Sequence, residues 1–130
     1  MFAQPRGIQA YRQVQAESRS PLELVVMLYD GALANVTQAR EAAARGDLRQ
    51  RGASVSKALS IVGALREGLN LSDGGTVAAE LDRLYDYVTC RLLDVTARHD
   101  AGALTEVHTI LSGLRDAWYQ IASQPRQAVS

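Results

Sequence analysis

Apolar residues recur at intervals of three and four along most of this 130-residue chain. Such spacing predicts amphipathic helices that each bury one face. In the first of these segments two further leucines, Leu24 and Leu28, lie off the apolar stripe, so this helix is apolar on a second face and has to be covered on more than one side. The stripe itself consists of Leu22, Val25, Tyr29, Ala32, Leu33, Val36 and Ala39.

Local signals mark where this first helix begins and ends. Ser20 and Glu23 have the spacing of a capping box, and Pro21 occupies the first helical position, where its missing N–H costs nothing. A basic residue and then Gly46 follow the last periodic position, as is typical of a helix C-terminus. The helix is therefore predicted to run from residue 21 to about residue 44.

Three further segments repeat the helical periodicity. We expect Asp47 to cap the second helix, a glycine-rich turn over residues 70–75 to precede the third near Thr76, and Asp100 to cap the fourth. Their apolar stripes are Val55, Ala58, Leu59, Val62, Leu65 and Leu69; then Val77, Leu81, Leu84, Tyr85, Val88, Leu92 and Val95; then Leu104, Val107, Leu111, Leu114, Trp118 and Ile121.

Helices of about 20–25 residues with short connections favour antiparallel neighbours. The sequence therefore predicts an all-α fold, an antiparallel up-down four-helix bundle over residues 20–122. A short N-terminal leader over residues 1–19 and a flexible tail over residues 123–130 are expected to flank it. The leader carries Ile8 and Tyr11 on one side of a helical turn. Spacing leaves open whether the leader fills a gap in the core or is a detachable hook for a partner.

Charge and composition exclude several classes of function. The chain has 14 basic and 14 acidic residues, so no global field favours nucleic acid or an anionic membrane. Cys90 is the single cysteine, which fits a reducing compartment. No apolar run approaches the roughly 20 residues of a membrane span, and the N-terminus lacks the apolar core of a signal peptide. We expect a soluble, cytoplasmic protein without membrane insertion.

Residues that could support catalysis are sparse. His99 and His108 have no cysteine or carboxylate at metal-ligand spacing, and the glycine pair at residues 74–75 lacks the lysine of a phosphate-binding loop. A cluster of arginines near the first turn has no interleaved aromatic residues, which disfavours nucleic-acid binding. We therefore expect no catalytic residue, no cofactor and no metal, and the protein is predicted not to be an enzyme.

Surplus apolar residues are the strongest functional signal in the sequence. Large contiguous apolar patches usually mark interfaces, so we expect a partner that lies in grooves as an amphipathic helix. The residues beyond the predicted stripes are Leu24, Leu28, Ile61, Tyr87, Leu93, Ile110 and Tyr119.

Five segments, taken in order, resemble one known family. They are GIQAY at residues 7–11, SPLEL at residues 20–24, MLYDGA at residues 27–32, LYDY at residues 84–87 and LRDAW at residues 114–118. Together they resemble the flagellar secretion chaperone family, FliS, and the resemblance covers nearly the whole chain.

This resemblance implies an antiparallel four-helix bundle that binds the disordered C-terminal segment of flagellin in the cytoplasm. It also implies that the protein prevents premature polymerisation and delivers flagellin to the flagellar type III export apparatus, through the gate protein FlhA. The residues that match the family's N-terminal pair, Ile8 and Tyr11, are implied to cap the flagellin groove and to dock at that gate. Some relatives also engage an anti-sigma factor or the regulator FliW.

The residues expected to contact a partner come from all parts of the chain: Ile8, Tyr11, Leu24, Leu28, Tyr29, Ile61, Tyr85, Tyr87, Leu93, Trp118 and Tyr119.

Two other functions remain open. A histidine phosphotransfer domain is also a four-helix bundle, although His108 lacks the neighbouring lysine and glycine that would help a phosphoryl group approach. The second open function is that of a structural bundle, which would dimerise through its second apolar face and be a homodimer when free of client.

Overall fold

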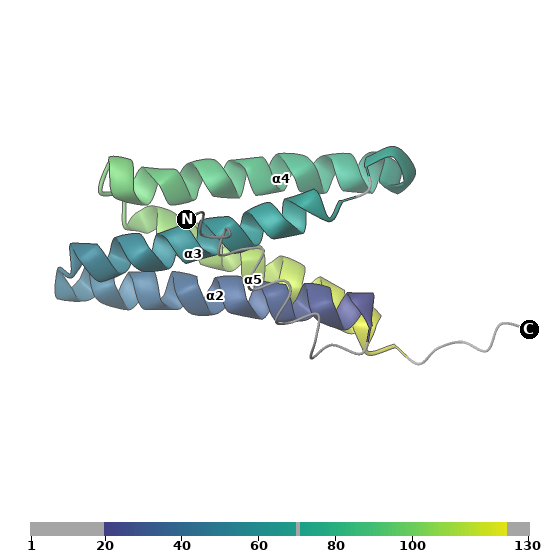
Figure 1. Ribbon diagram of the computed structural model, residues 1–130, viewed down its shortest axis with the longest axis horizontal. Helices are drawn as coiled ribbons and strands as arrows, with labels where there is room; N and C mark the ends of the chain where they lie inside the picture. The colour runs from purple at the N-terminus through teal and green to yellow at the C-terminus, as the bar shows by residue number, and fades with distance from the viewer. Residues whose placement is uncertain (1–19, 70, 125–130) are drawn as a thin grey trace, which may run out of the picture.

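The computed structural model describes residues 20–69 and 71–124 and shows four helices: α2 (Pro21–Arg45), α3 (Leu48–Glu67), α4 (Leu71–Ala97) and α5 (Gly102–Ala122). No strand occurs within those residues, and the predicted all-α, four-helix fold is confirmed. Figure 1 shows the helices lying along one long axis, with α2 and α4 running in one direction and α3 and α5 in the other. None of the described helices is long and apolar enough to cross a membrane.

The caps predicted around the first turn are confirmed. The Ser20 hydroxyl accepts a hydrogen bond from the Glu23 N–H at 3.1 Å, which satisfies a free donor at the start of α2. Gly46 ends the helix in the left-handed conformation, with φ 73°, where a side chain would be strained. The Asp47 carboxylate then accepts from the Gln50 N–H at 3.0 Å and begins α3.

Two predicted boundaries are wrong. The expected turn over residues 70–75 is helical from Leu71 and breaks at Gly75, whose φ of 58° and ψ of −136° redirect the chain into the rest of α4. The other is the cap of α5. Ala101 occupies the capping position without a side-chain hydrogen bond, because the Asp100 carboxylate is turned to Arg91, 3.1 Å away.

The core is formed mainly around α2, which packs against both α3 and α5, whereas α4 closes the bundle less extensively. Because α2 has neighbours on two sides, its buried arc is wider than one stripe. Leu24 and Leu28 are therefore core residues, as is Ile61 of α3, and their assignment to surplus surface is wrong. Burying each large apolar side chain contributes about 1.5–3 kcal/mol.

The two ends of the bundle differ in how well the helices cover one another. Near the turns at residues 45–51 and 97–104, which we call the closed end, Val36, Val95 and Leu104 are at most 1% exposed. At the opposite end, which we call the open end, the same apolar stripes emerge from the core. Val77 is 66% exposed and Ile121 is 49% exposed, so their prediction as buried stripe residues is wrong.

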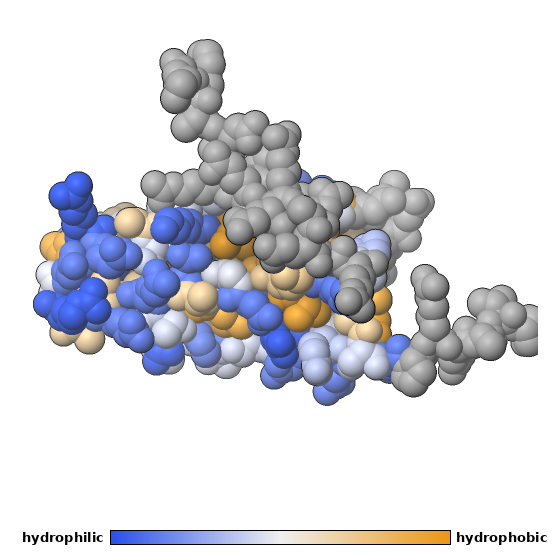
Figure 2. Space-filling model, turned by 60° about the horizontal axis from the view of Figure 1, so that its bottom comes forward, coloured by the Kyte–Doolittle hydropathy of each residue, from blue (hydrophilic) through white to orange (hydrophobic). Residues whose placement is uncertain are grey.

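The open end comprises the first turns of α2, the last turns of α3 and α5, and the N-terminal half of α4. Figure 2 shows the same contrast on one face, which is mainly hydrophilic at the left, where α2 ends, and carries hydrophobic side chains farther to the right. Apolar surface without a covering helix is thus concentrated at one end of the bundle.

Candidate functional site

A groove of about 210 Å³ lies at the open end and receives side chains from every part of the bundle. We call it the main groove. Among its described lining residues none is charged, and the side chains that contain a polar group are those of Tyr85 and Trp118. It is lined by Pro21, Leu24, Val25, Leu28, Ala64, Leu65, Gly68, Leu69, Tyr85 and Trp118.

The size of the main groove limits what it can hold. Sites for drug-sized molecules and cofactors usually enclose about 300–1,000 Å³. A smaller apolar groove at the junction of several helices suits a few apolar side chains presented by a partner helix. The geometry therefore favours the docking of a polypeptide.

A second hollow of about 280 Å³ lies between α2 and α5, on the other side of the first turns of α2. We call it the side groove, and Val26, Met27 and Tyr119 provide its apolar walls. The guanidinium of Arg115 lies 4.7 Å from the centre of the Tyr119 ring and pairs with Asp30 across the two helices at 2.8 Å. The cation over the aromatic face holds that ring in place.

Two tyrosines meet beneath the main groove. The hydroxyls of Tyr29 on α2 and Tyr85 on α4 are hydrogen-bonded, and their rings lie 6.5 Å apart between centroids. Burial raises the pKa of both phenols, because the charged phenolate form is disfavoured away from water. Because this hydrogen bond is surrounded by apolar side chains, it fixes the position of α4 along α2.

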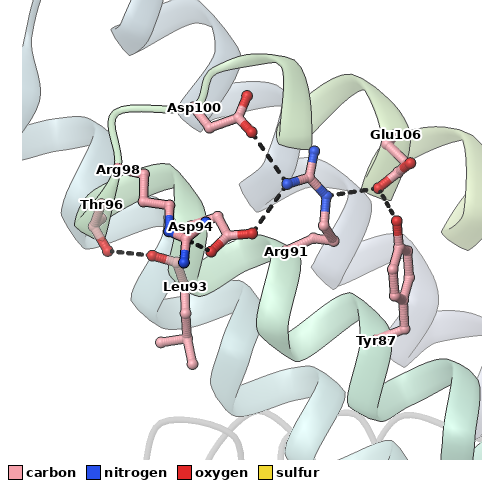
Figure 3. A network of polar contacts seen from close by, with 8 residues as sticks. All are labelled: Tyr87, Arg91, Leu93, Asp94, Thr96, Arg98, Asp100 and Glu106. Atoms are coloured by element: carbon pink, nitrogen blue, oxygen red, sulfur yellow. Dashed lines mark hydrogen bonds and ion pairs between the residues drawn. The ribbon is translucent and has the colours of Figure 1, made fainter.

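The closed end carries a polar network instead of a groove (Figure 3). The Arg91 guanidinium pairs with the carboxylates of Asp94, Asp100 and Glu106 at 3.0, 3.1 and 2.7 Å. The Tyr87 hydroxyl donates to the same Glu106 at 2.7 Å. These hydrogen bonds, from Tyr87 first and then from Arg91, lower the pKa of the Glu106 carboxyl. The network fastens α4 to the start of α5.

Two basic side chains meet at this end as well. Arg51, one of the arginines clustered near the first turn between helices, is buried, and its Nη2 lies 3.4 Å from Nδ1 of His99. His99 has a positive φ of 52° in the turn before α5, while His108 is half-buried on α5. In the part of the chain that the structure describes, no three His, Cys, Asp or Glu side chains are placed so that they could hold a metal ion together.

The predicted partner-contacting residues separate into three sets. Leu24, Leu28, Tyr85 and Trp118 line the main groove with Tyr29 beneath it, and Tyr119 lines the side groove. Ile61 is buried in the core, while Tyr87 and Leu93 are 45% and 49% exposed on α4, away from both grooves. Ile8 and Tyr11 lie outside the described residues.

Sequence reasoning missed several lining residues of the main groove. Val25, Leu65 and Leu69 were assigned to core stripes, and nothing was predicted for Ala64. Gly68, at the end of α3, completes this wall of the groove. The signal that indicates these residues is that each apolar stripe continues to the end of its helix. Where a stripe extends past the helices that cover it, its side chains form the wall of a groove.

Comparisons with known proteins agree with this arrangement. The family described as flagellar protein FliS matches residues 4–125. The chain is 42% identical to the flagellar secretion chaperone FliS of Salmonella typhimurium over 121 residues, which cover 89% of this chain and 90% of that relative. It is 34% identical to the flagellar secretion chaperone FliSB of Pseudomonas aeruginosa, over 87% of this chain and 93% of the relative. A FliS chaperone of Bacillus subtilis is 31% identical over 91% of this chain and 87% of the relative.

Proposed function

Because this chain belongs to the FliS family, which includes flagellar secretion chaperones, we propose that it binds the C-terminal segment of flagellin and escorts it to export. The bound segment would be unavailable for assembly, which prevents premature polymerisation in the cytoplasm. The complex then reaches the flagellar type III export apparatus, with the gate protein FlhA as a second partner.

The observation that carries this proposal is the main groove, where four helices leave apolar walls uncovered. A segment that folds only on binding has to offset an ordering cost of about 2–5 kcal/mol by burying apolar area. The half-buried Val25, Leu69 and Trp118 supply that area, and no described lining residue is a charged side chain that would need a matching charge. Flagellin's C-terminal segment would enter as an amphipathic helix with its apolar side chains in the groove.

Ile8 and Tyr11 are part of the proposal through the family resemblance. We assign them the capping of the client groove in the free protein and the contact with FlhA in the complex. Replacing both by alanine should weaken FlhA binding by the client-loaded chaperone. In a pull-down, unchanged recovery of FlhA would remove the second of these two roles.

The first test measures client binding directly. Purified chain is titrated calorimetrically with full-length flagellin and with flagellin lacking its last ~40 residues, a length that corresponds to about two helices. We expect binding of the full-length protein and none of the truncated one. Equal affinity for the two forms would contradict the proposal.

Two matched variants locate the binding surface. Ala64 and Ala53 are both half-buried on α3, about three turns apart and so on one side of the helix, but only Ala64 lines the main groove. Ala64→Glu should weaken flagellin binding at least about tenfold, since it places an unpaired charge against apolar surface. Ala53→Glu should leave the affinity within about twofold. Similar losses in the two variants would place the client elsewhere.

A further inference from the structure

A cluster of ion pairs joins α3 to α4 beside the main groove. The Arg66 guanidinium donates two hydrogen bonds to the Asp82 carboxylate, from Nε at 2.6 Å and from Nη2 at 3.4 Å. Its Nη1 donates to Asp86, one turn farther along α4, at 3.3 Å. Because a guanidinium donates in a fixed planar fork, these three bonds restrict where α4 lies relative to α3. We call this cluster the latch.

The latch connects two sides of the main groove. On α3, Arg66 directly follows Leu65, which lines the groove. On α4, Asp82 and Asp86 both lie within one helical turn of Tyr85, the residue that lines the groove from this helix. The three bonds of the latch therefore link the α3 side of the groove to its α4 side.

The exposure of the latch indicates what it can and cannot do. The side chains of Arg66, Asp82 and Asp86 are 38%, 30% and 62% exposed. Ion pairs at such exposure contribute little to the free energy of unfolding, because water screens them. Their geometry can still restrict the position of α4, the helix that packs less extensively against the rest of the bundle.

We propose that Arg66 is a positioning residue for client binding, which holds the α4 side of the main groove at a set distance from the α3 side. This inference rests on the proposed function, and it adds that the groove is formed before the client arrives. A preformed groove binds more tightly, because its walls lose less freedom on binding. Without the latch, α4 samples several positions, and only the fraction of molecules with the right groove width binds the client.

The first test needs no client. Trp118 is the single tryptophan of the chain, is half-buried and lines the main groove, so its fluorescence reports on this groove. In Arg66→Met, acrylamide should quench this fluorescence more strongly than in the unsubstituted chain, because α4 no longer holds the groove at one width. Lys57→Met is the matched control and should be quenched as the unsubstituted chain is, since Lys57 is an exposed cation of the same helix outside the latch. Equal quenching in all three proteins would overturn the inference.

The second test measures client affinity and stability on the same variants. In calorimetry with a peptide of flagellin's C-terminal segment, we expect Arg66→Met to bind about threefold to tenfold more weakly and Lys57→Met to stay within about twofold of the unsubstituted chain. The urea midpoint of Arg66→Met should stay close to that of the unsubstituted chain, which separates positioning from a loss of stability. Unchanged or higher affinity of Arg66→Met would overturn the inference, as would a fall in the midpoint large enough to explain the weaker binding.

A double-mutant cycle shows whether both partners act through the latch. Asp82→Asn removes the carboxylate that accepts two of the three bonds. The variant with both substitutions should bind the peptide at most about twofold more weakly than the weaker single variant, because each substitution breaks the same contact. Losses that multiply would contradict the inference. Failure of the unsubstituted chain to bind the peptide would instead contradict the proposed function, and the quenching experiment would still test the latch.

Discussion

The closed end and the open end are built from the same four apolar stripes, yet they have opposite properties. At the closed end, Gly46 and Asp47 stop one helix and start the next, and Arg91 holds three carboxylates around the second turn. At the open end, Gly68 follows α3 and Ser123 follows α5, both in right-handed helical conformation, and the stripe residues nearest to them, Leu69 and Ile121, are half-buried and exposed respectively. Identical periodicity produces core where neighbouring helices overlap and groove where they diverge.

This division indicates how one small bundle can remain folded and still offer apolar surface. Several fully buried residues that stabilise it, among them Val36, Val95 and Leu104, lie toward the closed end, so the open end can present uncovered walls without putting the whole fold at risk. Binding at the open end would add the missing neighbour for each stripe. The comparison predicts that substitutions at the closed end act mainly on stability and those at the open end mainly on binding.

The largest expected effect is that of Leu92→Ala, because Leu92 is fully buried between the helices. We expect the free energy of unfolding to fall by about 3 kcal/mol, from lost burial and the cavity left behind. Urea denaturation measures this loss. Client affinity of the folded protein should stay within about twofold. A loss under about 1 kcal/mol would mean that this region is packed as loosely as the grooves.

Leu69→Ala is the matched substitution at the open end. Leu69 is half-buried and lines the main groove, so less apolar area leaves the interior when it is truncated. We expect a stability loss of about 1 kcal/mol or less, together with client binding weakened about fivefold to tenfold. Calorimetry and urea denaturation on the same preparation separate the two effects. A stability loss equal to that of Leu92→Ala would erase the proposed difference between the ends.

Predictions from the sequence succeeded where the determinants are local. The caps at Ser20, Asp47 and Gly46 depend on residues within one helical turn, and all three are confirmed. Asp100 resembles a cap equally well, but Arg91 reaches it from another turn of the chain, and this pairing is a tertiary contact. Gly75 was expected in a turn, while the helical turn before it was not foreseen.

The site was only partly predictable for the same reason. Periodicity shows which face of α2 is apolar, but it does not show that two helices cover that face, so Leu24 and Leu28 were wrongly assigned to surplus surface. The grooves depend on where four stripes cease to overlap, which is decided by helix length and tilt together. No single segment contains that information, and Ala64 accordingly carries no signal in the sequence.

The two side-chain caps provide a finer comparison of the ends. Ser20→Ala and Asp47→Ala each remove one hydrogen bond to a helix N-terminus and should each lower stability by about 1 kcal/mol. Only Ser20 stands beside groove walls, because the first turn of α2 contributes Pro21 and Leu24. We therefore expect Ser20→Ala to weaken client binding about twofold to threefold, by fraying those walls. Asp47→Ala should bind the client with the affinity of the unsubstituted chain. If calorimetry shows weaker client binding in both variants, this prediction is contradicted.

The smallest expected effect concerns pH and belongs to the closed end alone. Hydrogen bonds from Tyr87 and Arg91 lower the pKa of Glu106 in the folded chain, so its contribution to stability is present above its unfolded pKa. That contribution is lost as pH falls through the folded value. Glu106→Gln keeps the size of the side chain and removes this titration. Urea midpoints should therefore fall less between pH 7 and pH 3 in Glu106→Gln than in the unsubstituted chain. Because the carboxylate lies at the surface, the difference should be small and should shrink in high salt. Midpoints that fall in parallel would show that the Arg91 network does not stabilise the closed end.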